Sequence, residues 1–202
     1  SYKLVNTMKK CIILQINYLI LICLFIPCVA IAQPICQIQR FSAYNGLAQR
    51  SVTNILQDSK GFIWFSTWNG LNKFDGYTFK NYKAFSGDGC TLTSNRLAKI
   101  TQTQTCDIWC QTYDLRIYLF DSRREKFIDI LRPYENEKQQ TYAVQNVYTL
   151  PKGVSWIVCD RGAFRIDEQA YKAQEGEGIT LYNIEEKNLK GDQIITIFQD
   201  SD

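Results

Sequence analysis

Residues 51–82 read SVTNILQDSKGFIWFSTWNGLNKFDGYTFKNY, and this stretch decides the fold. Its apolar and aromatic segments are separated by three turn signals, at 58–61, 69–70 and 75–76, each of which ends in glycine. Short apolar runs bounded by such turns are typical of β-strands that pair as hairpins. The stretch therefore predicts four short strands, which is the content of one β-propeller blade.

The tryptophan of this stretch recurs at the length of a blade. Trp64 is followed by Trp109 and Trp156, at spacings of 45 and 47 residues, which suits four-stranded blades. Three other kinds of residue recur at similar distances from the tryptophans. The aliphatic pairs are Val52 and Ile55, Leu97 and Ile100, and Val144 and Val147; the turn glycines are Gly61 and Gly153; and the aspartates are Asp75, Asp121 and Asp167. We expect an all-β propeller with blades of about 45 residues, in which these tryptophans, glycines and aspartates are structural.

The strands of the first repeat differ in pattern. Residues 62–65 are apolar on both faces, as a strand buried between neighbouring blades requires. Val52 and Ile55 are three residues apart, which is a helical spacing. Because the segment between Gly46 and Gly61 is short for a helix, we expect a twisted or bulged strand there.

The phase of the repeats divides the chain. Blade 1 is placed at 51–96, blade 2 at 97–143 and blade 3 at 144–193, after a polar connecting segment at 33–50. Residues 194–202 repeat the start of blade 1, and the matching residues are Ile194, Ile197, Gln199, Asp200 and Ser201. This echo predicts the start of a fourth blade. Because propellers close with four to eight blades, we expect the N-terminal piece of a longer polypeptide.

Residues 1–32 predict a signal peptide that starts at Met8 and is cleaved after Ala32. Two lysines, an apolar stretch and a small-x-small triplet are the three regions of a secretory leader. An uncleaved membrane anchor is the alternative, although the apolar run is shorter than the ~20 residues of a spanning helix. A lipoprotein signal ending at Cys28 fits less well, since a proline precedes it. We therefore expect export from the cytoplasm.

Export would leave five cysteines in the mature chain, Cys36, Cys90, Cys106, Cys110 and Cys159. An odd number leaves at least one thiol free or paired with another chain. In an extended segment, Cys106 and Cys110 would be separated by roughly 13 Å, beyond the ~7 Å Cα limit of a disulfide. We expect these cysteines to be small buried hydrophobic residues, and we expect no metal site.

Charge and histidine content exclude several classes of function. Lys3, Lys9 and Lys10 are the only charged residues up to position 32, so the remainder has 20 basic and 20 acidic residues. This neutral remainder shows no sign of the clustered basic face that binds nucleic acid. The chain has no histidine, so it cannot build a Ser-His-Asp triad or a histidine metal ligand. We expect no cofactor and no catalytic residue.

The first repeat closely resembles the two-component regulator propeller repeat, at VTNILQDSKGFIWFST (52–67) and NGLNKFDG (69–76). A leader, Phe41, the Asn-Gly-Leu at 45–47 and then this repeat are similar to the start of the periplasmic sensor of Bacteroidetes hybrid two-component systems. The later repeats depart from the Asp58 and Gly61 of the first, at Thr103, Cys106 and Leu150.

This resemblance implies a double propeller outside the cytoplasm, a β-sandwich, a helix in the inner membrane, a cytoplasmic histidine kinase, a receiver and usually an AraC-type DNA-binding domain. It implies a sensing role for the present residues, with glycans or oligosaccharides as ligands. It also implies homodimeric receptors that control polysaccharide-utilisation genes. The propeller fold by itself hosts many unrelated functions.

Paired carboxylates are the one catalytic arrangement that the sequence leaves open, because their separation is set in three dimensions. Close pairs stand in polar stretches, where we expect solvated surface, and they are Glu135 and Glu137, Glu175 and Glu177, and Glu185 and Glu186. The rival to a sensor is therefore a secreted propeller enzyme or lectin that acts on polysaccharide.

Seven residues follow the tryptophan-bearing strands by four to seven positions and are predicted to gather at one rim. Propeller ligands bind at loops, and sugars pack on aromatic faces beside planar polar groups. The candidate ligand-binding residues are Trp68, Asn69, Tyr113, Asp114, Arg116, Asp160 and Arg161. The alternative is structural, with Trp68 covering the blade and Asn69 turning the chain.

Overall fold

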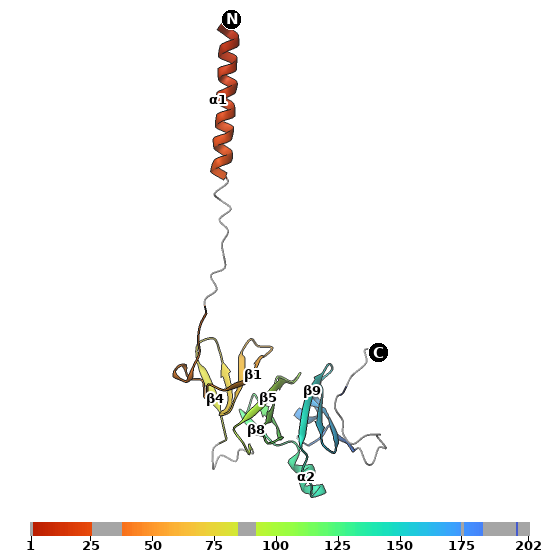
Figure 1. Cartoon of the computed structure of the whole chain (residues 1–202). Helices are drawn as coiled ribbons and strands as arrows, with labels where there is room; N and C mark the ends of the chain where they lie inside the picture. The colour runs from red at the N-terminus through yellow and green to blue at the C-terminus, as the bar shows by residue number, and fades with distance from the viewer. Residues whose placement is uncertain (1, 26–37, 85–91, 175, 184–196, 198–202) are drawn as a thin grey trace. The chain divides into compact units, whose positions relative to one another are not determined.

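The computed structural model describes residues 2–25, 38–84, 92–174, 176–183 and 197 (Figure 1). Two compact units make up the chain, Ser1–Arg40 and Phe41–Asp202. The first contains helix α1 (Tyr2–Phe25), whose described side chains are exposed. Within the described part of the chain, no helix combines the length and apolarity that crossing a membrane requires. The predicted cleavage point after Ala32 lies outside the described residues, and the signal peptide stays a prediction.

The described residues of the second unit form three four-stranded antiparallel sheets, each made of consecutive strands (Figure 1). The first sheet consists of β1 (Val52–Gln57), β2 (Ile63–Thr67), β3 (Gly70–Phe74) and β4 (Phe79–Tyr82). The second consists of β5 (Leu97–Gln102), β6 (Ile108–Thr112), β7 (Ile117–Asp121) and β8 (Lys126–Ile128). The third consists of β9 (Val144–Leu150), β10 (Val154–Cys159), β11 (Gly162–Asp167) and β12 (Ile179–Asn183). These sheets are the blades, and the predicted all-β class with four-stranded blades is confirmed.

The described helices of this unit are short. They are η2 (Ala43–Asn45), α2 (Arg132–Lys138) between β8 and β9, and α3 (Glu168–Ala173) between β11 and β12. The predicted start of a fourth blade lies outside the described residues, except for Ile197.

The first strand of every blade carries a bulge at the same repeat position. The pairing of β1 with β2 skips a residue between Val52 and Asn54. The pairing of β5 with β6 skips between Leu97 and Lys99, and β9 skips residue 145 against β10. The bulged strand predicted for 52–55 is confirmed. A bulge turns the following side chains relative to the pleat, which accounts for the aliphatic spacing of three.

The repeated tryptophans pack on the next blade. Trp64 on β2 is 2% exposed, and its ring meets Phe120 of the second blade at 5.7 Å between centroids. Trp109 on β6 is 1% exposed and lies in a cluster with residues of the third blade. Trp156 on β10 is only partly buried, beside Tyr182 of its own blade. Burial of the tryptophan face therefore depends on the blade that follows.

The second residue of each repeated aliphatic pair lies on the face of the blade opposite the tryptophan. Ile100 and Val147 are each 4% exposed, because they lie in the tryptophan clusters of the preceding blades. Ile55, their equivalent in the first blade, is 61% exposed. Phe41 packs on the ring of Phe74 farther along this face, at 4.8 Å between centroids. The connecting segment therefore covers part of the face that Ile55 leaves exposed.

The turns between the first two strands of each blade all have a positive φ three residues before the tryptophan. Gly61, Cys106 and Gly153 have φ of 89°, 66° and 73°, in the left-handed region that favours glycine. Cys106 thus adopts the turn although its side chain departs from the repeat. In the first turn, Asp58 accepts two backbone N–H groups and the indole N–H of Trp64, the last at 2.8 Å.

The three repeated aspartates close the turn after the third strand. One carboxylate oxygen each of Asp75, Asp121 and Asp167 accepts the backbone N–H groups of the residues two and three positions later. Hydrogen bonds from the Thr78 and Tyr77 amides hold the pKa of Asp75 below its usual range. Each aspartate thus satisfies backbone donors that the strand ends leave free.

Candidate functional site

The turns after β2, β6 and β10 lie at the other end of the blades and share a repeated backbone hydrogen bond. The N–H groups of Trp68, Tyr113 and Asp160 donate to the carbonyl oxygens of Ser51, Arg96 and Ala143, at 3.3, 3.0 and 3.0 Å. Each acceptor directly precedes the first strand of its blade. We call this end the rim, and it comprises residues 50–51, 68–70, 93–96, 113–115, 143 and 160–161.

Two exposed aromatic rings meet at the rim. Trp68 and Tyr113 occupy the same repeat position in the first and second blades, and their rings form an edge-to-face contact at 6.2 Å and 87°. Trp68 is 42% exposed and Tyr113 is 53% exposed. The guanidinium carbon of Arg96 lies 4.7 Å from the centre of the Trp68 ring, within the range of a cation–π interaction. The rim thus offers aromatic surface and a cation together.

The polar residues beside this pair have different roles. Asp114 is exposed, and its carboxylate accepts a hydrogen bond of 2.9 Å from the Thr93 hydroxyl. Asn69 is partly buried, and its amide donates to the carbonyl oxygen of Ala48 at 3.3 Å. Asp114 therefore presents an acceptor at the rim surface, whereas Asn69 holds the connecting segment in place.

Arg116 was predicted to be a ligand-binding residue, but in the structure its side chain pairs with acidic residues of this chain. Its side chain is 18% exposed and forms a two-pronged ion pair with Glu135 of α2, at 2.5 and 2.7 Å, and a bond of 3.1 Å to Asp129. Burial raises the pKa of Glu135, but the Arg116 and Tyr142 hydrogen bonds outweigh it and hold that pKa below its usual range. The guanidinium is engaged in anchoring α2, because its donors already face two carboxylates.

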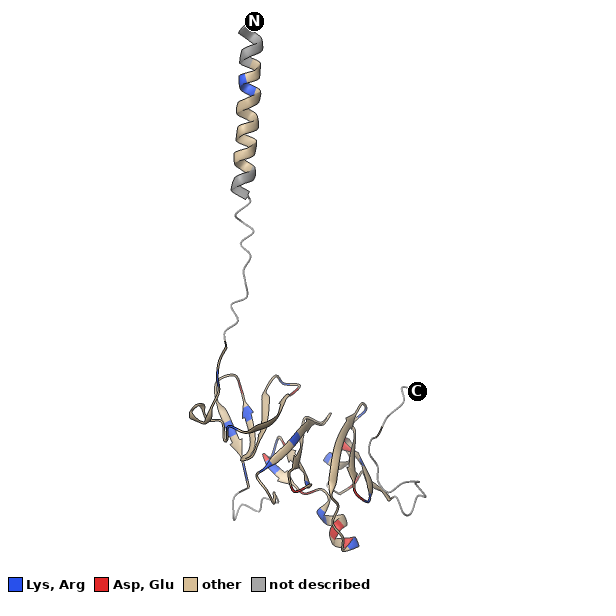
Figure 2. Ribbon diagram, viewed as in Figure 1, with Lys and Arg blue, Asp and Glu red and all other residues tan. Residues whose placement is uncertain are grey.

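The acidic residues of α2 also differ from one another. The Glu135 side chain is 10% exposed, so it is not the solvated surface that we expected, whereas Glu137 is 69% exposed. Glu177 is exposed, and the other residues of the predicted carboxylate pairs lie outside the described residues. Figure 2 shows both signs of charge on α2. The helix is therefore held by one buried acid and presents the rest to solvent.

The third blade places a polar pair at its part of the rim. Asp160 accepts the backbone N–H of Ala143 at 2.9 Å, and its other oxygen lies 3.7 Å from the Arg161 guanidinium. The described contacts therefore join Trp68, Tyr113 and Arg96 in one cluster. Asp160 and Arg161 form a second group on the third blade.

The described cysteines of the blades are free thiols. Burial raises the pKa of the Cys110 thiol and raises that of Cys159 to about 12, so both match the predicted small buried residues. Cys106 is partly exposed at its turn. No group of three potential metal ligands occurs among the described residues. Cys36 and Cys90 lie outside the described residues.

Arg96 is a rim residue that the spacing rule missed, because it precedes a strand and does not follow a tryptophan. Its register was still readable. Arg96 comes directly before Leu97, as Ser51 comes before Val52, and both carbonyl oxygens receive the rim hydrogen bond. Alignment of the repeats at their first strands would have placed Arg96 at the rim.

Part of the sequence and the fold are similar to proteins of two-component systems. Residues 46–69 match the family described as Two component regulator propeller. Over 53 residues, which make up 26% of the chain, the sequence is 45% identical to Histidine kinase P4 of Formosa agariphila. The family match lies on the first repeat, the stretch whose resemblance to this family is described above.

Two solved structures have similar folds. The extracellular domain of BT3049, assigned as a hybrid two component system of B. thetaiotaomicron, superposes with a TM-score of 0.60 at 27% identity over 78% of the chain. The extracellular domain of BT4673, assigned as a one component system of the same species, gives 0.55 at 20% identity over 82% of the chain. The chain spans 22% and 23% of those domains, and 4% of the length of the histidine kinase.

Proposed function

We propose that this two component regulator propeller is the ligand-sensing portion, outside the cytoplasm, of a hybrid two-component histidine kinase, and that its rim binds an oligosaccharide. In this proposal a signal peptide exports the chain, and the parent protein is a homodimer anchored in the inner membrane. The kinase lies elsewhere in that parent, so the present residues are not catalytic. The output is control of polysaccharide-utilisation genes.

The observation that carries the proposal is the exposed contact between Trp68 and Tyr113. Sugar rings present C–H faces that pack on aromatic rings, and their hydroxyl groups need polar partners at the side. The Asp114 carboxylate follows directly on Tyr113 and is held by Thr93. Support for a sensor comes from the similarity to Histidine kinase P4 and to the extracellular domain of BT3049.

The test is binding of the 202-residue chain to a panel of oligosaccharides, followed by isothermal titration of those retained. Tyr113→Ala should weaken binding by at least about tenfold, because it removes a ring from the contact surface. Tyr77→Ala is the matched control, since Tyr77 is 91% exposed on the turn at the other end of the first blade. Equal binding by the Tyr113 variant and the unsubstituted chain, or no retained oligosaccharide, would contradict the proposal.

A further inference from the structure

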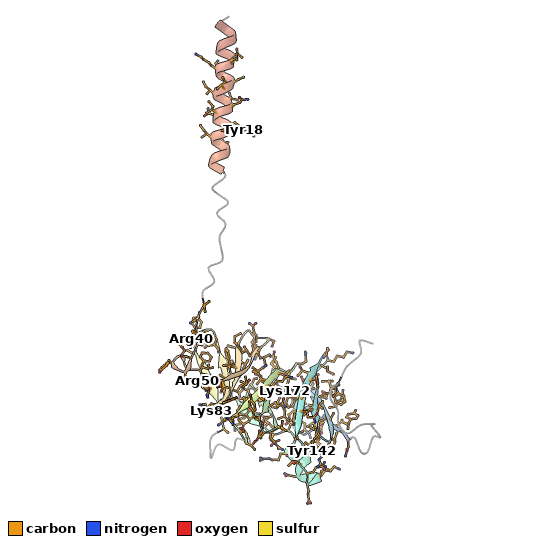
Figure 3. All side chains as sticks on the ribbon, viewed as in Figure 1. Tyr18, Arg40, Arg50, Lys83, Tyr142 and Lys172 are labelled. Atoms are coloured by element: carbon orange, nitrogen blue, oxygen red, sulfur yellow. The ribbon has the colours of Figure 1, made fainter. Side chains whose placement is uncertain are left out.

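Three basic residues lie on or next to the segments that adjoin Trp68. The Arg96 guanidinium lies over its ring. Arg50 precedes Ser51, whose carbonyl oxygen accepts the Trp68 N–H. The Lys83 side chain runs along Gly70, where a Cβ atom would come within 2.9 Å of its Cγ. Figure 3 labels Arg50 and Lys83 on the first blade, and Figure 2 draws the basic residues in blue.

These three cations have no carboxylate partner within the part of the chain that the structure describes. Other basic side chains of the blades do: Lys80 lies 2.6 Å from Glu125, and Lys172 lies 2.8 Å from Asp107. Two acids stand at the rim. Asp114 is bonded to Thr93, and Asp160 lies beside Arg161 on the third blade. Among the residues that the structure describes, the surface around Trp68 therefore carries more positive than negative charge.

We propose that the rim around Trp68 binds the anionic group of a saccharide, either the carboxylate of a uronic acid or a sulfate ester. Arg96 is the residue that binds this group. This inference rests on the proposed function and specifies the chemical class of its ligand. A guanidinium matches a carboxylate or a sulfate through two parallel N–H donors. A saccharide that rests on Trp68 and Tyr113 lies within reach of that guanidinium.

The Arg96 side chain is prepared for this role. Its backbone N–H donates to the Ser94 hydroxyl at 3.2 Å, and its carbonyl oxygen accepts the Tyr113 N–H at 3.0 Å. The side chain is then stacked on Trp68. Because backbone and side chain are both held, the guanidinium loses less conformational freedom when an anion binds.

The experiment compares three oligosaccharides of equal length with the 202-residue chain by isothermal titration. The probes are galactotetraose, tetragalacturonate and a sulfated galactotetraose. The anionic probes should bind at least about tenfold more tightly than the neutral one. Tighter binding of the uronate or of the sulfate ester identifies the source of the anion. Added salt should weaken binding of the anionic probes selectively.

Arg96→Gln tests whether Arg96 binds the anionic group. It should lower affinity for the anionic probe by about tenfold and change affinity for the neutral probe by less than about twofold. Arg123→Gln is the matched control, because Arg123 is exposed at the opposite end of the second blade. Equal affinity for neutral and anionic probes, or an equal effect of Arg96→Gln on both, would overturn the inference while leaving oligosaccharide binding intact. Absence of binding to all three probes would overturn both this inference and the wider proposal of a saccharide site.

Discussion

The indole N–H of Trp109 donates a hydrogen bond of 2.9 Å to the hydroxyl of Ser155, and this bond joins the second blade to the third. The Ser155 hydroxyl donates in turn to one carboxylate oxygen of Glu168, at 2.5 Å. The other Glu168 oxygen accepts the backbone N–H of Gln104 in the second blade, at 2.7 Å. The chain of hydrogen bonds therefore crosses the interface twice, and it accounts for an acid that is only 4% exposed.

In the first blade, the acceptor for the buried indole N–H lies within the same blade. Trp64 donates to Asp58 in the turn of its own blade, whereas the second blade has Thr103 at that position. The Thr103 hydroxyl accepts the backbone N–H of Asp107, so the turn keeps a bond while the indole loses its local acceptor. A buried indole N–H needs a partner, and the neighbouring blade provides it.

Ser155→Ala should lower the free energy of unfolding by about 1–3 kcal/mol, because it leaves the Trp109 N–H and one Glu168 oxygen buried without their partner. Urea unfolding monitored by tryptophan fluorescence measures this loss. Thr141→Val removes an exposed hydroxyl and should change stability by less than about 0.5 kcal/mol. A Ser155 variant as stable as this control would mean that the interface does not depend on the bond.

Glu135→Gln should destabilise the protein by roughly 1–3 kcal/mol at neutral pH, since it breaks the pair with Arg116. The pKa of Glu135 is lowered in the folded state. The ionised carboxylate therefore stabilises the fold at pH values above the usual carboxyl pKa of 4.5. This stabilisation is lost as the pH falls below that value and through the lowered pKa of the folded state. The gap between the variant and the unsubstituted protein should therefore shrink between about pH 5 and pH 3.

Denaturant unfolding across that pH range measures the effect, and Glu137→Gln on the same helix is the control. Glu137 is 69% exposed and 3.9 Å from Lys138, so its replacement should cost less than about 0.5 kcal/mol at any of these pH values. A gap for Glu135→Gln that stays constant from neutral to acidic pH would show that charge does not hold α2.

Trp64→Ala should cost about 3–5 kcal/mol, because the ring is 2% exposed between two blades. Trp68→Ala should cost less than about 1 kcal/mol, because that ring stands at the rim and is 42% exposed. Thermal or urea unfolding of the two variants side by side separates the structural tryptophan from the candidate binding residue. Equal losses would contradict the division of roles.

The phase of the tryptophans was enough to predict the blades, because the strand that carries them is buried between sheets and tolerates few other residues. The burial of Trp156 could not be predicted in the same way. Its ring position repeats that of Trp64 and Trp109, but exposure depends on what the next blade contributes, and the described part of that region is limited to Ile197.

The candidate site was only partly predictable for a similar reason. Trp68 and Tyr113 follow their strands at the same distance, and the contact between adjacent blades brings them together. Arg116 follows a tryptophan strand just as regularly, yet its partner Glu135 lies 19 residues later on α2, a helix that the repeat pattern does not contain. Local spacing can place a side chain at one end of a blade, but it cannot tell which distant group will neutralise it.

Cys106→Gly should stabilise the protein by about 0.5–1 kcal/mol. Cys106 has a φ of 66°, where a side chain with a Cβ atom is strained, and the first and third blades have glycine at the same turn position. The thiol makes a weak contact, at 3.5 Å from the Ser59 hydroxyl, so little is lost with it. Cys106→Ala keeps the Cβ atom and should leave stability nearly unchanged.

Urea unfolding under reducing conditions compares the unsubstituted protein with the glycine and alanine variants. If the alanine variant gained as much as the glycine variant, loss of the thiol and not relief of the backbone would be the cause.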